Sequence, residues 1–303
     1  MYKIRRLREK WESRQRKRGL ARAFADPTRD IVHLQFEAKA IGMFAQLSSC
    51  VRAADIAQQF GKRPVMRLVS ENYVDPGEQA DWFSAYFVNK AEADLPPDLA
   101  PTIMSNGGEL PLEPIYESRE EVKALFTRHF GIRPEIEEQV DAFAREHRLG
   151  AHTLSLHYRG TDKHREAPQQ AMADVIQRVS RYIDTLQGVE NIFVASDEAS
   201  FIEAASDGIA GLPVVSMDDS VRSDEGTPVH LEGLKAGNRA MGYDAVRNAV
   251  MLSRGGWLCR TSSFLSAWSA VFNPDIKVAV FNTPYEETTW RLERVVLQDA
   301  RRI

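Results

Sequence analysis

The pair His157 and Arg159 has the residue types and spacing needed to bind a phosphorylated ligand. An apolar run at 153–156 precedes the pair and predicts a short buried strand. Ligands of open α/β sheets bind at the carboxyl ends of strands, and residues two apart on a strand point to the same side. A guanidinium fork beside an imidazole suits a phosphate or pyrophosphate, and Arg159 could stabilise negative charge on a leaving phosphate. The alternatives are a salt-bridged surface arginine and a core histidine held by the backbone.

A second polar cluster follows the apolar run 257–259. Thr261, Ser262 and Ser263 precede Phe264, where a helix is predicted to begin. The N-terminus of a helix presents N–H groups and partial positive charge, which suits a pyrophosphate. Plain N-capping by a serine is the alternative interpretation.

The segment His157-x-Arg159-x-Thr161-Asp162-Lys163 resembles the signature of the fucosyltransferase superfamily. This group contains the α-1,6-fucosyltransferases, the nodulation and protein O-fucosyltransferases and their bacterial relatives. The resemblance implies a GT-B fold and a metal-independent, inverting glycosyltransferase with GDP-fucose as donor and no cofactor. Thr161, Asp162 and Lys163 would orient Arg159 or meet the acceptor, with Asp162 as a candidate general base. A simple turn is the alternative.

One departure from the family pattern concerns Gly160, because the α-1,6-fucosyltransferases carry a second arginine at that position. The resemblance also assigns further residues to nucleotide-sugar binding. The Ser262–Phe264 segment would grip the diphosphate, and Asp197 would bond a ribose hydroxyl or simply cap helix 199–205. Asp244 or Asn248 would bind the base, with a solvated helix face as the alternative; Asn248 has only one acceptor oxygen, so either Asp244 binds guanine or the base is different.

The second half of the chain alternates between strands and helices, which predicts a parallel, doubly wound sheet. Strands are expected at 153–157, 191–195, 213–217, 257–259 and 276–281, with helices at 167–187, 199–205, 243–253 and 264–272. A final helix is expected at 286–303. We assign residues 151–303 to the domain that binds the nucleotide sugar.

Residues 1–150 are assigned to an acceptor-side domain with a boundary near Gly150. A strand at 31–36, a helix at 47–60 and a strand at 64–69 predict an α/β unit, followed by a loop-rich stretch at 72–115. Gly42 would belong to the turn that opens onto the cleft in the resembled family. Two Rossmann-like domains facing a cleft, the GT-B-like α/β arrangement, are therefore expected.

Composition excludes several classes of protein. The 303 residues have a net charge of -4, which argues against nucleic-acid binding, and two cysteines make no disulfide framework. Walker, Rossmann-glycine and Gly-x-Ser-x-Gly motifs are absent, as is any clear metal-ligand spacing. Residues 1–24 hold ten lysines and arginines; this arm could contact an anionic membrane or be a solvated helix. Without a signal peptide or apolar span, a bacterial cytoplasmic protein, peripheral to the inner membrane at most, is expected.

Three hypotheses of function remain open at this stage. The first is fucosyl transfer from GDP-fucose to a glycan or glycoconjugate acceptor. The second is transfer from a different nucleotide sugar. The third is a non-catalytic, partner-binding protein that keeps the fold and uses the basic arm as its contact.

Overall fold

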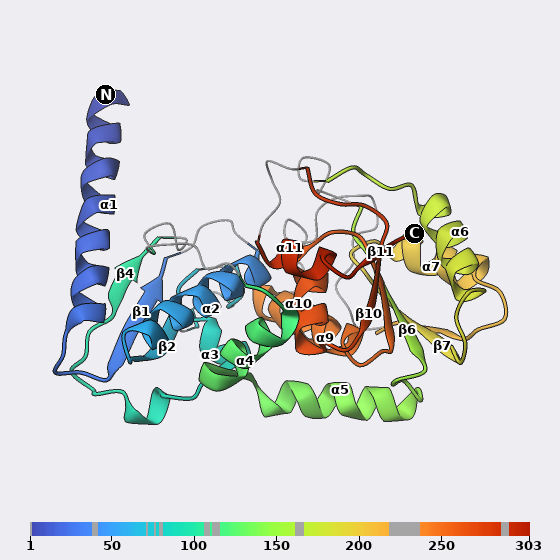
Figure 1. The fold of residues 1–303 in the computed structure, drawn as a ribbon, viewed down its shortest axis with the longest axis horizontal. Helices are drawn as coiled ribbons and strands as arrows, with labels where there is room; N and C mark the ends of the chain where they lie inside the picture. Colours follow the sequence, from blue (N-terminus) through green and yellow to red (C-terminus); the bar gives the residue numbers. More distant parts are fainter. Residues whose placement is uncertain are drawn as a thin grey trace. The chain divides into compact units, whose positions relative to one another are not determined.

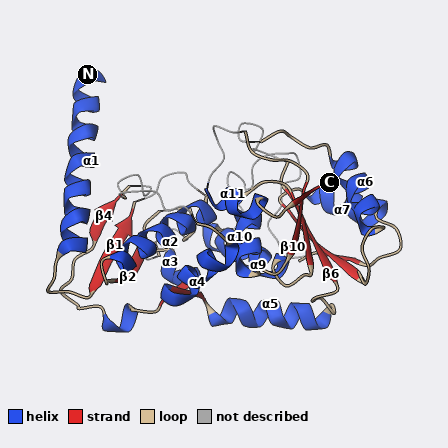
Figure 2. Ribbon diagram, viewed as in Figure 1, coloured by secondary structure: helices blue, strands red, loops and turns tan. Residues whose placement is uncertain are grey.

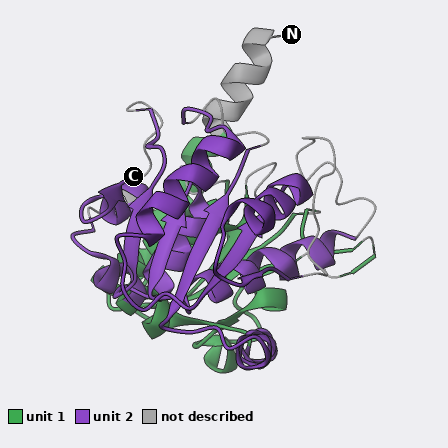
Figure 3. Cartoon of the chain, turned by 90° about the vertical axis from the view of Figure 1, so that its right-hand side faces the viewer, with its two compact units in different colours: residues 1–115, 124–133 green, residues 116–123, 134–303 purple. Residues whose placement is uncertain are grey.

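The chain forms two compact units in a computed structural model that describes residues 2–37, 42–70, 72–75, 77–78, 81–105, 110, 116–160, 167–217, 237–285 and 291–303. One unit contains residues 1–115 and 124–133, and the other contains residues 116–123 and 134–303 (Figure 3). The sequence places the boundary near Gly150, whereas helix α5 (Pro134–Glu146) belongs to the second unit. The physical reason is packing: α5 contacts helix α9 (Asn238–Leu252), and Phe143 meets Phe193 edge-on at 6.3 Å between ring centroids.

The first unit has a parallel sheet with the strand order β2-β1-β4 and a separate antiparallel pair, β3 with β5. Helix α2 buries Leu47, Val51 and Ala54 on one face, as the periodicity of its apolar residues predicts. In chain order the elements of the first unit are α1 (Tyr2–Ala25), β1 (Ile31–Phe36), α2 (Met43–Gln59), β2 (Arg63–Leu68), α3 (Phe83–Tyr86), β3 (Phe87–Asn89), a 3-10 helix (Glu92–Asp94), β4 (Thr102–Met104), α4 (Arg119–His129) and β5 (Phe130–Ile132). The first residues of α4 belong to the second unit.

Helix α1 carries the basic residues of the N-terminal arm and is anchored by its last turns. Leu20 and Phe24 are buried, α1 contacts β4, and Phe24 stacks on Phe60 at 5.6 Å between ring centroids. No helix in the described ranges has the length and apolar character to cross a membrane. Contact between α1 and anionic lipid stays a prediction.

The second unit contains a sheet whose strands run parallel in the order β11-β10-β9-β6-β7-β8 (Figure 2). After α5, its elements are β6 (Thr153–Tyr158), α6 (Met172–Ile183), β7 (Asn191–Ser196), α7 (Ala199–Gly208), β8 (Val214–Val215), α9, β9 (Trp257–Arg260), α10 (Phe264–Phe272), β10 (Lys277–Val280), α11 (Arg291–Leu297) and β11 (Arg301–Arg302).

Helices cover both faces of this sheet, which explains why β6 is buried along its whole length. Helices α6 and α7 lie on one face, where Leu154, Leu156 and Tyr158 join Val175 and Phe201 in a buried cluster (Figure 1). Helices α9 and α10 lie on the other face. Because side chains alternate along a strand, His157 of β6 points towards that second face.

The C-terminus departs from the sequence-based expectation of a helix over 286–303. Helix α11 ends at Leu297, and the last residues pair with β10 as the edge strand β11. The Arg178 side chain of α6 donates a hydrogen bond from Nε to the Ile303 carbonyl at 2.8 Å and another to the Phe281 carbonyl at 2.8 Å. A cation on a distant helix therefore fixes the chain end, which no local pattern reveals.

Candidate functional site

The carboxyl ends of β6 and β9 meet at the point where the strand order of the second unit reverses. From β6 the chain continues on one side to β7 and β8, then returns to the other side of β6 as β9. In doubly wound sheets, ligands bind in the crevice at such a switch point. Two polar motifs were predicted, one following the apolar run at 153–156 and one following the run at 257–259. They therefore lie at the ends of neighbouring strands.

The main chain around Arg159 is fixed at this point by hydrogen bonds with Thr261. Its N–H donates to the Thr261 hydroxyl at 2.9 Å, and the Thr261 N–H donates to the His157 carbonyl at 3.0 Å. The Arg159 side chain is 30% exposed, and its Nε lies 3.8 Å from the Asp197 carboxylate. The guanidinium is thus oriented by a carboxylate and still accessible to an anionic ligand.

The turn after β9 is tightly built and buried. Ser262 donates from its main-chain N–H to Asn282 Oδ1 at 2.8 Å and from its hydroxyl to the Asn282 carbonyl at 3.0 Å. Ser263 caps α10, because its hydroxyl accepts a hydrogen bond from the Ser266 N–H at 3.2 Å. N-capping, the alternative interpretation, therefore describes Ser263 correctly. Contact of a diphosphate with Ser262, Ser263 or half-buried Phe264 stays a prediction.

A fully buried ion pair contacts and stabilises this turn. The Arg260 guanidinium donates two hydrogen bonds to the Glu293 carboxylate, at 2.9 and 2.7 Å, and both side chains are completely inaccessible to solvent. Arg260 also donates to the Ser266 hydroxyl at 2.8 Å and to the Ser263 carbonyl at 3.0 Å. Glu293 on α11 is a structural partner of the site that sequence reasoning missed, since 33 positions separate the two residues.

His157 is buried and uncharged. Burial, followed by the charges of Arg260 and Arg159, lowers its pKa to about 3, while a backbone hydrogen bond with Thr261 acts in the opposite direction. Its Nδ1 has no hydrogen-bond partner among the described residues. His157 can therefore offer a neutral hydrogen-bonding group at this point, but no positive charge.

This burial predicts a pH dependence of stability. A folded pKa of about 3 lies below the ordinary value of 6.5, so protonation favours the unfolded chain and stability is lost as pH falls below 6.5. We expect His157→Gln to reduce the slope of unfolding free energy between pH 6 and pH 4 by about 1 kcal/mol per pH unit. Chemical unfolding at a series of pH values measures it. His129 of the first unit, whose pKa is also lowered, provides the matched variant His129→Gln. An unchanged slope in His157→Gln would contradict the assignment of a buried neutral imidazole.

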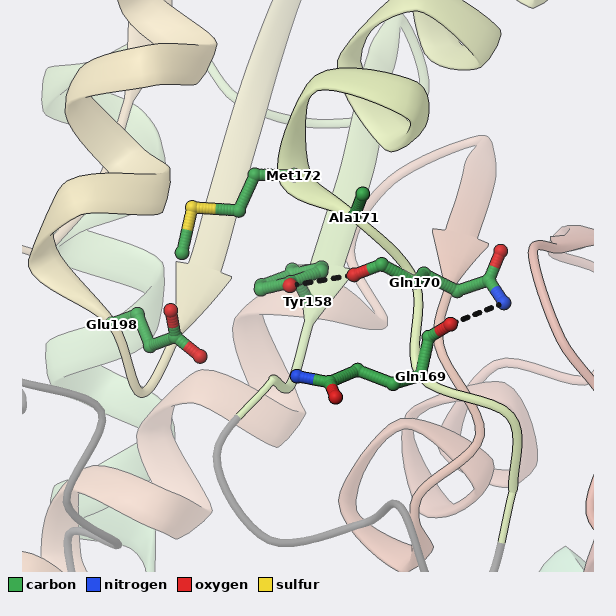
Figure 4. Close-up of a pocket in the computed structure, with 6 residues that line it drawn as sticks. All are labelled: Tyr158, Gln169, Gln170, Ala171, Met172 and Glu198. Atoms are coloured by element: carbon green, nitrogen blue, oxygen red, sulfur yellow. Dashed lines mark hydrogen bonds between the residues drawn. The ribbon is translucent and has the colours of Figure 1, made fainter.

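A pocket of about 470 Å³ lies at the carboxyl ends of β6 and β7 (Figure 4). Its lining residues come from the end of β6, the approach to α6 and the residue before α7; they are Tyr158, Gln169, Gln170, Ala171, Met172 and Glu198. The Glu198 carboxylate was not predicted from the sequence. The available signal was its place beside Asp197 at a strand end, where two adjacent carboxylates face the ligand-binding edge.

Glu198 also explains the departure at Gly160. A Cβ atom at position 160 would lie 2.1 Å from Glu198 Oε1 and 2.8 Å from the Tyr158 hydroxyl. No side chain fits there unless the carboxylate and the ring move. Glu198, rather than Asp197, holds the N-cap position of α7, and it does so without a side-chain capping bond. The capping alternative for Asp197 is therefore not the observed arrangement.

The two candidates for base recognition lie on α9. Asp244 is buried and lies 3.5 Å from the Arg247 guanidinium, while the Asn248 amide donates to the Asp244 carbonyl at 3.0 Å. Asp244 is thus not on a solvated helix face, and Asn248 is half-buried. Their role in binding a base stays a prediction.

The remaining predicted residues are not joined to this site by the structure. Thr161, Asp162 and Lys163 lie outside the described residues. Gly42 occupies the N-cap position of α2 in the first unit, with extended backbone that any residue can adopt. In the described ranges, no group of three or more His, Cys, Asp or Glu side chains is arranged to hold a metal ion.

Comparison with known proteins identifies the fold. No protein-family model and no curated protein sequence matches the chain. Among solved structures, NodZ α-1,6-fucosyltransferase soaked with GDP-fucose is similar, with 17% identity over 80% of this chain and 93% of that chain and a TM-score of 0.53. NodZ from Bradyrhizobium gives 16% identity over 80% and 94% and a TM-score of 0.51. A mutant of Arabidopsis thaliana FUT1 in complex with GDP gives 12% identity over 96% and 81% and a TM-score of 0.50. These matches confirm the expected fucosyltransferase-like fold of the GT-B class, with parallel sheets in an α/β chain.

Proposed function

We propose that this chain is a glycosyltransferase that takes a sugar from GDP-fucose and transfers it, with inversion at the anomeric carbon, to a glycan or glycoconjugate acceptor. The observation that carries the proposal is the placement of Arg159 at the switch point, bonded through its main chain to Thr261 and oriented by Asp197. GDP and GDP-fucose are the ligands named for the similar NodZ structures, which supports the choice of donor.

Arg159 would act on the leaving group. As an acceptor hydroxyl oxygen forms a bond to the anomeric carbon, the bond from that carbon to the β-phosphate oxygen breaks and its electron pair stays on the diphosphate. The hydroxyl proton passes to a base, for which Asp162 is the candidate, or to water. A fixed guanidinium stabilises this charge as it develops. Because an arginine stays protonated at all ordinary pH values, it supplies the positive charge that a divalent cation supplies in other transferases.

A donor with a different base is the second candidate, and one contact favours it. The Asp244 carboxylate, which would accept the paired N–H groups of guanine, already lies 3.5 Å from Arg247 of its own helix. Recognition of guanine by Asp244 would have to share or replace that ion pair. A uracil or cytosine nucleotide would leave it in place.

A thermal-shift panel separates the two candidates. We expect GDP and GDP-fucose to raise the melting temperature of the chain, because a ligand that binds only the folded state stabilises it by mass action. UDP, CDP and their sugars, at the same concentrations, serve as the matched series. A shift confined to the UDP compounds would reject the guanine donor, and no shift with any nucleotide would favour the non-catalytic, partner-binding alternative.

A further inference from the structure

The pocket beside Gly160 contains a buried carboxylate that receives no hydrogen bond in the described part of the chain. Glu198 is only 8% exposed, and its main-chain N–H donates a hydrogen bond to the Ser196 hydroxyl at 3.1 Å. No described residue donates to its carboxylate. The carboxylate faces the pocket and has little access to water, so a ligand that brings hydrogen-bond donors would be stabilised here.

The desolvation of this group has a measurable consequence. Burial, with a smaller contribution from the negative charge of Asp197, raises the pKa of Glu198 above its ordinary value. Burial and the same two carboxylates raise the pKa of Tyr158 to about 12, so that ring keeps its proton. Glu198 is therefore the one acidic side chain among the six lining residues, and none of the other five is a cation.

The other lining groups suit a ring with one polar edge and one apolar face. The Gln169 amide donates to the Gly160 carbonyl at 3.3 Å, and the Tyr158 hydroxyl donates to the Gln170 carbonyl at 2.9 Å. These bonds fix the pocket wall opposite Glu198 (Figure 4). Met172 and Ala171 add apolar surface that can contact C–H groups. Small-ligand sites likewise combine apolar surface with a few polar groups that are fixed in place.

The Glu198 carboxylate lies against the main chain at Gly160. It can do so because position 160 has no side chain; a Cβ there would lie 2.1 Å from Glu198 Oε1. Gly160 directly follows Arg159, and Glu198 directly follows the Asp197 that orients Arg159. The pocket thus adjoins the residues proposed to bind the diphosphate.

We propose that this pocket binds the hydroxyl groups of a sugar ring, with the Glu198 carboxylate accepting hydrogen bonds from two of them. The proposal rests on the function proposed above, which supplies two sources of the same chemistry: the fucosyl ring of the donor and a sugar of the acceptor. Adjacent hydroxyls can occupy both carboxylate oxygens, whereas an amide in the same place offers one acceptor only. Sugar binding would also favour the ionised form of Glu198.

The experiment compares Glu198→Gln with the wild type in calorimetric titrations of GDP and GDP-fucose. Glu203→Gln, at an exposed position of α7, the helix that Glu198 precedes, is the matched control. If the donor sugar occupies the pocket, Glu198→Gln weakens GDP-fucose binding by about 10- to 100-fold and leaves GDP binding unchanged. If an acceptor sugar occupies it, both affinities stay the same and the KM of a chito-oligosaccharide acceptor rises by a similar factor.

Two other outcomes count against the proposal, in different ways. Unchanged GDP-fucose affinity together with an unchanged KM in Glu198→Gln would overturn the sugar pocket while leaving the proposed transfer intact. Failure of the wild type itself to bind GDP or GDP-fucose would reject the proposed function, and the pocket assignment with it. A thermal melt of each variant shows that the second unit is folded, so that loss of binding cannot come from unfolding.

Discussion

Replacing Arg159 with alanine is expected to lower kcat/KM for sugar transfer by about 10³-fold, because removing a fixed donor to developing negative charge costs about that much in other enzymes. The loss should fall mainly on kcat, since the charge on the diphosphate grows as the bond breaks. The main chain at position 159 should stay in place, because the hydrogen bond that fixes it runs from the main-chain N–H of residue 159 to the Thr261 hydroxyl and does not involve the Arg159 side chain. Rates of GDP release from GDP-fucose in the presence of acceptor measure the effect.

Two further variants make the Arg159 result interpretable. Arg159→Lys keeps the charge but loses the planar fork, so it should recover only part of the activity. Arg181→Ala removes an exposed arginine of α6 whose side chain donates hydrogen bonds to Gln177 of its own helix, and should leave the rate unchanged. Wild-type transfer by a folded Arg159→Ala protein would refute the assigned role and favour the partner-binding alternative.

Replacing Glu293 with alanine is expected to destabilise the second unit by about 3–5 kcal/mol, because it leaves the Arg260 guanidinium buried without its carboxylate. Arg260 lies wholly inside the protein, and among the described residues its other acceptors are the Ser266 hydroxyl and the Ser263 carbonyl. Both acceptors belong to the turn that begins α10. Loss of Glu293 should therefore loosen this turn as well as lower stability. Urea unfolding followed by circular dichroism measures the change, with the two units fitted as separate transitions.

An exposed ion pair of the same unit is the control for this measurement. Arg254 and Asp141 approach to 2.7 Å, but their side chains are 39% and 55% exposed. Asp141→Ala should therefore cost less than about 1 kcal/mol. Equal effects of Glu293→Ala and Asp141→Ala would contradict the buried pair. The double variant Arg260→Met with Glu293→Leu should recover stability relative to Glu293→Ala, since apolar pairs replace buried ion pairs at little cost.

Much of the second unit follows from local pattern. The apolar runs at 153–156, 191–195 and 257–259 are long enough to define strands, and the helices between them have the expected spacing. The observed ends of helices and strands differ from the expected ones where local signals conflict. Helix α6 begins at Met172 rather than 167, because the segment before it carries Pro168 and lines the pocket instead. In the first unit, strand β4 lies inside a stretch that its prolines and glycines predict to be loop.

Local sequence places polar, phosphate-binding residue types at the ends of apolar strands, because each strand and the residues after it are encoded within a few positions. It also determined the α/β class, through the alternation of strands and helices. The pairing of β9 with β6 is visible in the folded chain alone, and it brings the Thr261 hydroxyl to 2.9 Å from the Arg159 main-chain nitrogen across 102 positions. The burial of Arg260 against Glu293 and the open space that Gly160 leaves for Glu198 were decided at the same level. Strand order and burial depend on how the whole chain covers its apolar surface, and that free energy is shared among residues far apart in the sequence.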